Sequence, residues 1–463
     1  MSKKLHSESF RVLCMILVLV ACMMTFATIQ PFGDGPDEIN RFKIVEYIYK
    51  HGTLPVGDDP EVLIDGFGAS YAFQPMLTYM IDGYLLRAVS VFEPTLEMRV
   101  FISRLVDVFM GLITALYVKK LGDLLFDNKK TVWFFTLAVA FLPQNMFVHT
   151  YVNTDSMGLL SIAIVLHASI LGMKEEFSKK SCVELAIGII LCALSYYNCY
   201  GIVLCAILLF GAYFVKIKSN KVSYDYQNLL KKGILISVIV LLGISWWFIR
   251  NGILYDGDIL ALEARQICAA QTCTEPFNPY TRDTYQRLGI PLIEMVFGTD
   301  YFTLVWRSFI AMFGPMRIPT HHYIYWAFAG AFFLCVIGLL IPKKAQVLTW
   351  MNRYQKICVN VTMVIAIVIP VILALYYSYT YDFQPQGRYY LPMVIPFMYF
   401  LTIGFEKLVT LLSDIVGKKN PKMQAMSCAF MYHAVYAFLT FCLLYSTFVA
   451  MIGYYKVNGG SLF

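Results

Sequence analysis

The sequence has few charged residues and lacks the motifs that bind nucleotides. Only 14% of its 463 residues are charged, whereas charged residues make up about a quarter of soluble domains, so a soluble protein is excluded. We find no Gly-rich phosphate loop, Walker motif, internal repeat or coiled-coil heptad in the sequence. An activity driven by cytosolic nucleotide hydrolysis is therefore not expected.

Cysteines are scarce in the polar segments. Ten of the 12 lie in or beside apolar runs, where a free Cys behaves as a small hydrophobic residue, and this excludes an extensive disulfide framework. Cys268 and Cys273 lie in the polar segment "CAAQTC". If this segment faces an oxidising compartment, a local disulfide is favoured over a metal site, because no His or further Cys lies nearby.

The sequence is rich in apolar runs long enough to cross a membrane. Hydrophobic residues make up 59% of the chain, with 35 Phe and 32 Tyr, as expected for a polytopic membrane protein with aromatic belts. The first run follows a basic start, as in a signal peptide, but its length favours a retained helix. We predict an all-α membrane protein with about eleven spans, at roughly 10–30, 101–118, 132–150, 155–173, 182–198, 200–217, 233–250, 323–342, 357–378, 389–412 and 430–453.

The distribution of basic residues predicts the orientation of these spans. Alternate connections hold 23 of the 37 Lys and Arg residues, and the other side holds 14 in much longer loops. The positive-inside rule therefore puts the amino terminus in the cytoplasm and the carboxyl terminus outside. The two large outer loops are predicted at 31–100 and 251–322.

The two sides also differ in the type of basic residue. Of the 14 outer basic residues 11 are Arg, whereas 21 of the 23 inner ones are Lys. Topology requires only positive charge, but the planar guanidinium is preferred where a carboxylate or phosphate is bound. The outer face is therefore predicted to bind an anionic ligand, and the net charge of +7 does not indicate nucleic acid.

The first outer loop carries a cluster of acids at the start of a predicted helix, within "PFGDGPDEINRFKIVEYIYKHGTLP". Apolar spacing predicts a helix between 36 and 52, which puts Asp34, Asp37 and Glu38 at its amino terminus and Asp37 and Arg41 on one face. Capping is the favoured interpretation for Asp34. Asp37 and Glu38 exceed what capping requires and are candidates for chemistry.

Two further outer segments carry polar candidates. Residues 71–89 predict an amphipathic helix on the outer membrane surface, with Gln74 at a hydrogen-bonding position in a cleft. In the short turn 147–158, His149, Asn153 and Asp155 are polar groups at membrane depth, which are costly unless paired or functional. Capping and function are equally supported for this turn.

Arginines at two other outer helix ends are candidates for binding an anion. Arg250 ends a predicted span, where simple snorkelling to the interface is a strong alternative. Arg388 follows Gly387 at a predicted helix start, where a cation opposes the helix dipole, so capping does not explain it. We expect Gly387 to let the backbone approach a ligand, and Arg388 to bind an anion together with the helix N–H groups. The adjacent His321 and His322 do not have the spacing of a metal site.

Five of these segments together resemble the motifs of a bacterial membrane family in the GT-C glycosyltransferase superfamily, akin to the protein O-mannosyltransferase and aminoarabinose transferase group. In order along the chain they are "GPDE", "YAFQPMLTY", "LPQNMFVHTYVNTDS", "WWFIRN" and "QPQGRYYLP". The sequence departs from the family pattern at Arg41, where a His is usual, and at Met76, where a second proline is usual.

The resemblance implies one GT-C-like transmembrane domain over 1–463 that transfers a monosaccharide from a polyprenyl-phosphate donor to an acceptor outside the cytoplasm. The acceptor would be a cell-wall or surface glycan, a lipid or a protein, and the reaction would be inverting. The chain would lie in the bacterial plasma membrane. Asp37 would be the general base and Glu38 would orient it or the acceptor.

The resemblance also implies a donor site and no cofactor. Arg388, Arg250 and Tyr389 would bind the donor phosphate and stabilise the leaving group. No divalent metal is required, because Arg can neutralise the phosphate. The remaining candidate substrate-binding residues are Asp34, Arg41, Gln74, His149, Asn153, Asp155 and Gln386.

Two alternatives remain open from the sequence. A polymerase or ligase of polyprenyl-diphosphate-linked glycans would also use outer arginines. A non-enzymatic transporter of lipid-linked sugars is the other, although such proteins often show paired repeats and broken helices.

Overall fold

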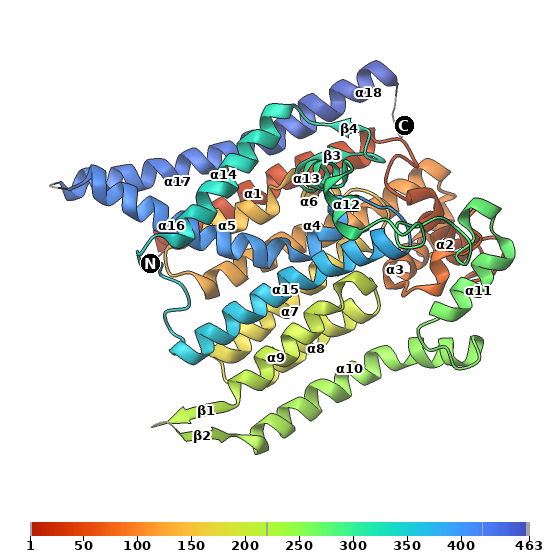
Figure 1. Ribbon diagram of the computed structural model, residues 1–463, viewed down its shortest axis with the longest axis horizontal. Helices are drawn as coiled ribbons and strands as arrows, with labels where there is room; N and C mark the ends of the chain where they lie inside the picture. Colours follow the sequence, from red (N-terminus) through yellow and green to blue (C-terminus); the bar gives the residue numbers. More distant parts are fainter. Residues whose placement is uncertain (1, 219–220, 419, 460–463) are drawn as a thin grey trace.

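The computed structural model describes residues 2–218, 221–418 and 420–459, which form a bundle of helices (Figure 1). The ends of the predicted domain, 1–463, lie outside the described residues. The long helices share a common direction, and shorter helices gather at one end of the bundle (Figure 1). These are α2 (Glu38–His51), α3 (Leu77–Ala88) and α11 (Leu262–Thr272), all from the predicted outer loops.

Eight of the helical segments among the described residues are long and apolar enough to cross a membrane. Each overlaps one of the predicted spans, which confirms an all-α polytopic membrane protein. The helices that make up these segments are α1 (Ser2–Ile29), α4 (Leu96–Leu125), α7 (Asp155–Lys174), α10 (Tyr226–Leu254), α14 (His322–Leu340), α15 (Arg353–Thr380), η5 (Gly387–Met393) with α16 (Val394–Val416), and α17 (Pro421–Leu444) with η6 (Tyr445–Met451) and α18 (Ile452–Asn458).

The other three predicted spans coincide with shorter helices. These are α5 (Lys129–Ala140), α8 (Lys179–Ala193) and α9 (Gly201–Tyr213), of 12, 15 and 13 residues. About 20 residues are needed to cross the hydrocarbon core without tilt or distortion. The total of eleven spans and their orientation therefore stay predictions.

Helix α7 forms the centre of the bundle. In its apolar window 94% of the residues are buried, compared with 11% for α10. A helix that is apolar on all sides is stable only when neighbours or lipid surround it. Since α7 packs against α4, α8 and α9, it is enclosed by protein, whereas α10 presents most of its surface to the surroundings.

Helices α14 and α16 approach each other through glycines. A Cβ atom added to Gly338 would lie 2.1 Å from the carbonyl oxygen of Gly404, and one added to Gly404 would lie 1.8 Å from that of Cys335. Small residues let membrane helices pack backbone to backbone. Larger residues at these two positions would separate α14 from α16.

The two large loops, which keep the names first and second outer loop from the predicted orientation, are folded against each other. The first contains α2, the 3-10 turn η1 (Tyr71–Phe73) and α3. The helix predicted between 36 and 52 is confirmed as α2, which ends at Gly52 with a positive φ of 70°. The second loop contains α11, α12 (Leu292–Phe297), α13 (Tyr301–Ile310) and the strands β3 (Met312–Phe313) and β4 (Ile318–Pro319), which pair antiparallel.

The local disulfide expected between Cys268 and Cys273 is wrong. Both cysteines are free. Cys268 lies within α11, and its thiol donates a hydrogen bond to the carbonyl of Gly68 at 3.3 Å. Cys273 follows the last residue of α11 as its C-cap. Because residues five apart along a helix point about 140° apart, the helical backbone up to Cys273 keeps the two sulfur atoms apart.

Candidate functional site

Asp37 precedes α2 with a strained backbone. Its φ is 63° and ψ 9°, in the left-handed region, and its side chain makes no capping hydrogen bond to the helix. A non-glycine residue in this conformation costs free energy and needs support from its surroundings. The helix therefore begins at Glu38 while the Asp37 carboxylate points away to other partners.

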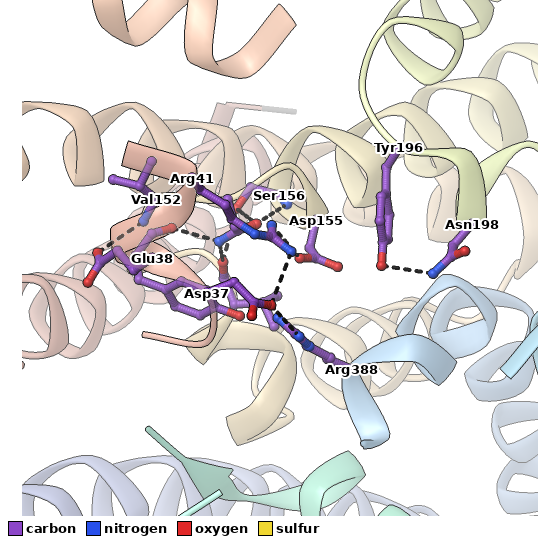
Figure 2. A network of polar contacts seen from close by, with 12 residues as sticks. Asp37, Glu38, Arg41, Val152, Asp155, Ser156, Tyr196, Asn198 and Arg388 are labelled. Atoms are coloured by element: carbon purple, nitrogen blue, oxygen red, sulfur yellow. Dashed lines mark hydrogen bonds and ion pairs between the residues drawn. The ribbon is translucent and has the colours of Figure 1, made fainter. Parts of the chain in front are cut away.

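A chain of alternating charges links Asp37 to two distant segments (Figure 2). Asp37 Oδ2 accepts a hydrogen bond from Arg388 Nη2 at 2.6 Å and lies 3.8 Å from Arg41 Nη2. Arg41 Nη1 in turn donates to Asp155 Oδ2 at 3.2 Å. The network connects the first outer loop, the start of α7 and η5.

The charge on Asp37 is stabilised by this network. Burial alone would raise the pKa of Asp37, but the positive charges of Arg388 and Arg41 outweigh it and hold the pKa below its usual value. The side chain of Asp37 nevertheless keeps 34% of its surface exposed. Asp37 is therefore an ionised carboxylate that is accessible to a ligand.

Arg388 has N–H donors that are not hydrogen-bonded. It is buried, and its Nε and Nη1 atoms have no hydrogen-bond partner among the described residues. Buried guanidinium groups are normally satisfied, so the open donors suit an anion from outside.

The expectation that Gly387 lets the backbone approach a ligand is wrong. A Cβ atom there would lie 2.0 Å from the backbone nitrogen of Phe309. The amide of Gly387 donates to Ser308 Oγ at 2.7 Å. The glycine instead lets η5 pack against α13, and this packing positions Arg388.

Glu38 does not take part in the accessible site. Both of its oxygens accept hydrogen bonds from Arg104, at 2.7 and 2.6 Å, and the two side chains have 0% exposed surface. Further N–H groups, from Gly33 and Val152, donate to the same carboxylate. Glu38 therefore fastens the first outer loop to α4 and cannot contact a substrate in this structure.

Two adjoining cavities meet at Asp37. The polar cavity, of about 130 Å³, is lined by residues from α2, η1, α11 and the segment before η5. The α15 cavity, of about 210 Å³, has one wall formed by Pro370, Leu373 and Ala374 of the spanning helix α15. The residues that line both cavities are Asp37, Tyr71, Arg265, Tyr377 and Tyr389.

Two arginines of the second outer loop line the polar cavity and were not singled out from the sequence. Arg265 and Arg282 take part in no ion pair among the described residues, and Arg265 Nε and Arg282 Nη2 are buried without a hydrogen-bond partner. The guanidinium of Arg282 stacks 3.7 Å from the ring centre of Tyr381. The excess of outer Arg over Lys pointed to such groups but could not say which of them converge.

Several predicted substrate-binding residues lie at the cavities. Arg41 and Gln74 line the α15 cavity, and Tyr389 lines both. Asp155 is buried behind Arg41 as its ion-pair partner. These positions agree with the expected cluster, while the roles of the residues stay predictions.

Other predicted residues line neither cavity. Asp34 was expected to cap α2, but its carboxylate accepts a hydrogen bond from Tyr455 at 2.8 Å and the cap position belongs to Asp37. Arg250 donates to the carbonyl of Pro55 at 2.6 Å and so ties α10 to the first loop. Gln386 donates to Gln384, which itself lines the polar cavity.

The turn before α7 also differs from the expected binding role. Asn153 donates to the carbonyls of Val148 and Tyr151 and accepts from the Ser156 amide, so its carboxamide closes the turn. His149 is buried, and a Cβ atom at Gly111 would lie 2.7 Å from it. Both residues support the packing of α7 and α4, and neither lines the two cavities at Asp37.

Within the described residues there is no group of three or more His, Cys, Asp or Glu side chains that could hold a metal ion. The positive charge available at the cavities comes from arginines.

Comparisons with known proteins identify a family and a fold. The model of a family described as "Predicted membrane protein (DUF2142)" matches residues 64–397. No curated protein sequence matches the chain.

Among solved structures, the chain is similar to the oligosaccharyltransferase AglB from Archaeoglobus fulgidus, in complex with an inhibitory peptide and a dolichol-phosphate, with a TM-score of 0.50 and 14% identity over 96% of this chain and 56% of AglB. It thus spans about half the length of AglB.

It is also similar to ArnT from Cupriavidus metallidurans bound to undecaprenyl phosphate, with a TM-score of 0.50 and 12% identity over 98% of this chain and 79% of ArnT. The fold is therefore the GT-C fold that the sequence motifs predicted.

Proposed function

The chain belongs to the DUF2142 family of membrane proteins, and we propose that it is a GT-C glycosyltransferase that moves a monosaccharide from a polyprenyl-phosphate donor to an acceptor. The observation that carries the proposal is the position of Asp37. It is an ionised, accessible carboxylate at the junction of two cavities, 2.6 Å from a guanidinium with open donors. A general base and an anion-binding group must be this close to act on one sugar phosphate.

The α15 cavity suits the lipid-linked donor. One of its walls is part of a membrane-spanning helix, so a polyprenyl chain can reach it from the bilayer. Arg265 lies on the wall shared with the polar cavity, and Arg388 lies beside Asp37. The guanidinium groups of Arg265 and Arg388 would bind the donor phosphate between the cavities. Arg265 would thus take the role that the sequence predicted for Arg250.

The polar cavity suits the acceptor. Tyr71, Tyr377 and Tyr381 supply aromatic surfaces on which a sugar ring can stack, and Gln384 and Asp382 supply hydrogen-bonding groups.

The proposed step forms one bond and breaks another. The acceptor hydroxyl oxygen attacks the anomeric carbon of the sugar, and its proton passes to Asp37. The bond between that carbon and the phosphate oxygen breaks, and the electron pair leaves with polyprenyl phosphate. Arg388 and Arg265 stabilise the charge that develops there, with inversion at the anomeric carbon.

Donor binding would also prepare the base. In the structure Arg388 Nη2 is hydrogen-bonded to Asp37. A phosphate that draws the guanidinium toward itself weakens this contact, which raises the proton affinity of Asp37. The base would then be strongest when the donor is in place.

Transfer by purified protein tests the proposal. Undecaprenyl-phosphate-linked sugars carrying a radiolabel are incubated with the protein and a bacterial envelope extract, and labelled product and released undecaprenyl phosphate are measured. We expect transfer by the wild-type protein and none by Asp37→Asn, which should keep its fold and its affinity for the donor.

Asp65→Asn is the matched control. It makes the same change in the same loop, and its side chain is fully exposed at the surface, so its activity should equal that of the wild type. Full activity of Asp37→Asn would remove the assignment of the base, and wild-type protein that transfers none of the offered sugars would contradict the proposed donor class.

One observation favours a second candidate, a polymerase or ligase that uses a polyprenyl-diphosphate donor. Three arginines, Arg265, Arg282 and Arg388, line the polar cavity, and this is more positive charge than a monophosphate requires. Offering the same sugar on monophosphate and on diphosphate carriers distinguishes the two, since the preferred carrier will give the faster release of lipid phosphate.

A further inference from the structure

A second lipid-sized groove lies far from Asp37. It has a volume of about 560 Å³ and runs between α1, α5 and α17. Figure 1 shows the beginnings of α1 and α17 at the end of the bundle opposite α2 and α11. This end was predicted to face the cytoplasm, so the groove is separate from the proposed transfer site.

The residues that line the groove are ordered from charged to apolar. Each of α1 and α5 lines the groove with one row of side chains. These rows begin near the charged residues Arg11, Lys129 and Lys130, and they end at the apolar residues Val18 and Phe141. From residue 129 to residue 141 a helix rises about 18 Å. This is close to half of the roughly 30 Å hydrocarbon core, which is the depth that one leaflet provides.

The positive charge at the mouth of the groove is not balanced by the protein. The neighbouring carboxylate of Asp123 is paired with Lys129 at 2.6 Å, and that of Glu8 with Lys119 at 2.9 Å. Arg11 and Lys130 form no ion pair among the described residues. Two cations therefore remain free at the level of lipid headgroups.

We propose that this groove binds one phospholipid with an anionic headgroup. The headgroup phosphate contacts Arg11 and Lys130, and an acyl chain lies along the apolar part of the groove, over Leu137 and Phe141. Basic pockets between membrane helices on the cytoplasmic side are suited to anionic headgroups. Charge complementarity selects such a lipid over a zwitterionic one with the same chains. The inference does not depend on the proposed transfer reaction.

Native mass spectrometry of the purified full chain tests the headgroup contact. Phosphatidylglycerol and phosphatidylcholine with identical acyl chains are titrated separately, and the wild-type protein should bind phosphatidylglycerol more tightly. At about 1 kcal/mol for each cation, the double variant R11Q/K130Q should bind it about 30-fold more weakly and lose the preference.

The control variant K344Q/K422Q removes the same charge from two lysines that do not line the groove. It should bind phosphatidylglycerol as the wild type does. An equal loss in this control would show a general electrostatic effect and overturn the proposed site, as would a wild-type protein that binds both lipids equally.

A third variant tests the groove itself. Cys14 is exposed and lines the groove, so Cys14→Trp fills it with little effect on the buried core. This variant should lose both lipids. If it retains phosphatidylglycerol, the lipid lies elsewhere, and this outcome overturns the proposal even if R11Q/K130Q does not fold.

Discussion

Two ion pairs between the same two helices should differ strongly in what they contribute to stability. Glu38 of α2 pairs with Arg104 of α4, and both side chains are fully buried. Glu46 of α2 pairs with Arg99 of α4 in the same two-pronged geometry, and these side chains are 19% and 18% exposed. The helices and the two-pronged geometry match, while Glu38 also accepts from two backbone N–H groups and Glu46 lies 3.5 Å from the exposed Lys50. The substitutions Glu38→Gln and Glu46→Gln therefore compare a buried carboxylate with a partly exposed one.

Removing one partner of a fully buried pair leaves an uncompensated charge and costs about 3–5 kcal/mol. Arg104 would retain hydrogen bonds to the carbonyls of Ala27, Gln30 and Pro31, which places the expected cost near the lower end of this range. Glu46→Gln should cost about 1 kcal/mol or less, because water can approach that pair.

Thermal unfolding in detergent measures the difference. For 463 residues the entropy of unfolding is about 1 kcal/mol per kelvin if every residue unfolds. Glu38→Gln should then lower Tm by at least about 3 °C, and by more if the helices stay formed in detergent, since the unfolding entropy is then smaller. Glu46→Gln should lower it by about 1 °C or less. Equal shifts in the two variants would refute the argument that burial decides the energy of these pairs.

Three other predictions concern the candidate site and a buried acid. Positive neighbours hold the pKa of Asp37 below its usual value, so kcat/KM should lose activity on the acidic side with a midpoint below about pH 4. Arg388→Gln should move this midpoint to higher pH. An unchanged midpoint would mean that another group titrates. Arg388→Lys should weaken donor affinity or turnover in the transfer assay, because a point charge replaces a planar fork with several donors. Asp82 is fully buried with no hydrogen bond to either oxygen, and burial raises its pKa well above the usual value. The Asp82 carboxyl group therefore lowers the free energy of unfolding once the pH exceeds the unfolded-state pKa of about 3.9. Asp82→Leu should raise Tm, and by more at pH 8 than at pH 5.

The fold was predictable because it depends on simple features of the sequence. Long apolar runs require helices in a membrane, and each predicted span overlaps a helix. The lengths of α5, α8 and α9 were not predictable. The apolar runs continue past the ends of these helices into turns, and only tertiary packing determines where the turns begin. The free thiols of Cys268 and Cys273 were missed because spacing alone does not reveal the helix between them.

The site was predictable in part. Asp37 and Arg388 stood out because capping explained neither, and the structure brings them together. Glu38 looked equivalent to Asp37, but the left-handed backbone at residue 37 turns the two carboxylates to different surroundings. The sequence could have indicated the partner of Glu38. Arg104 is a charged residue within a predicted apolar span, where a charge must be paired or functional.

The contacts of the first outer loop join residues that are synthesised at very different times. Glu38 and its partner are 66 residues apart, Arg41 and Asp155 are 114 apart, and Asp37 and Arg388 are 351 apart. The ribosome therefore delivers the partners of the loop in the order α4, α7 and η5. The guanidinium that faces the carboxylate arrives only when most of the protein is already in the membrane. A chain released early would thus contain Asp37 and Arg41 but lack Arg388, so the charge network could not be complete.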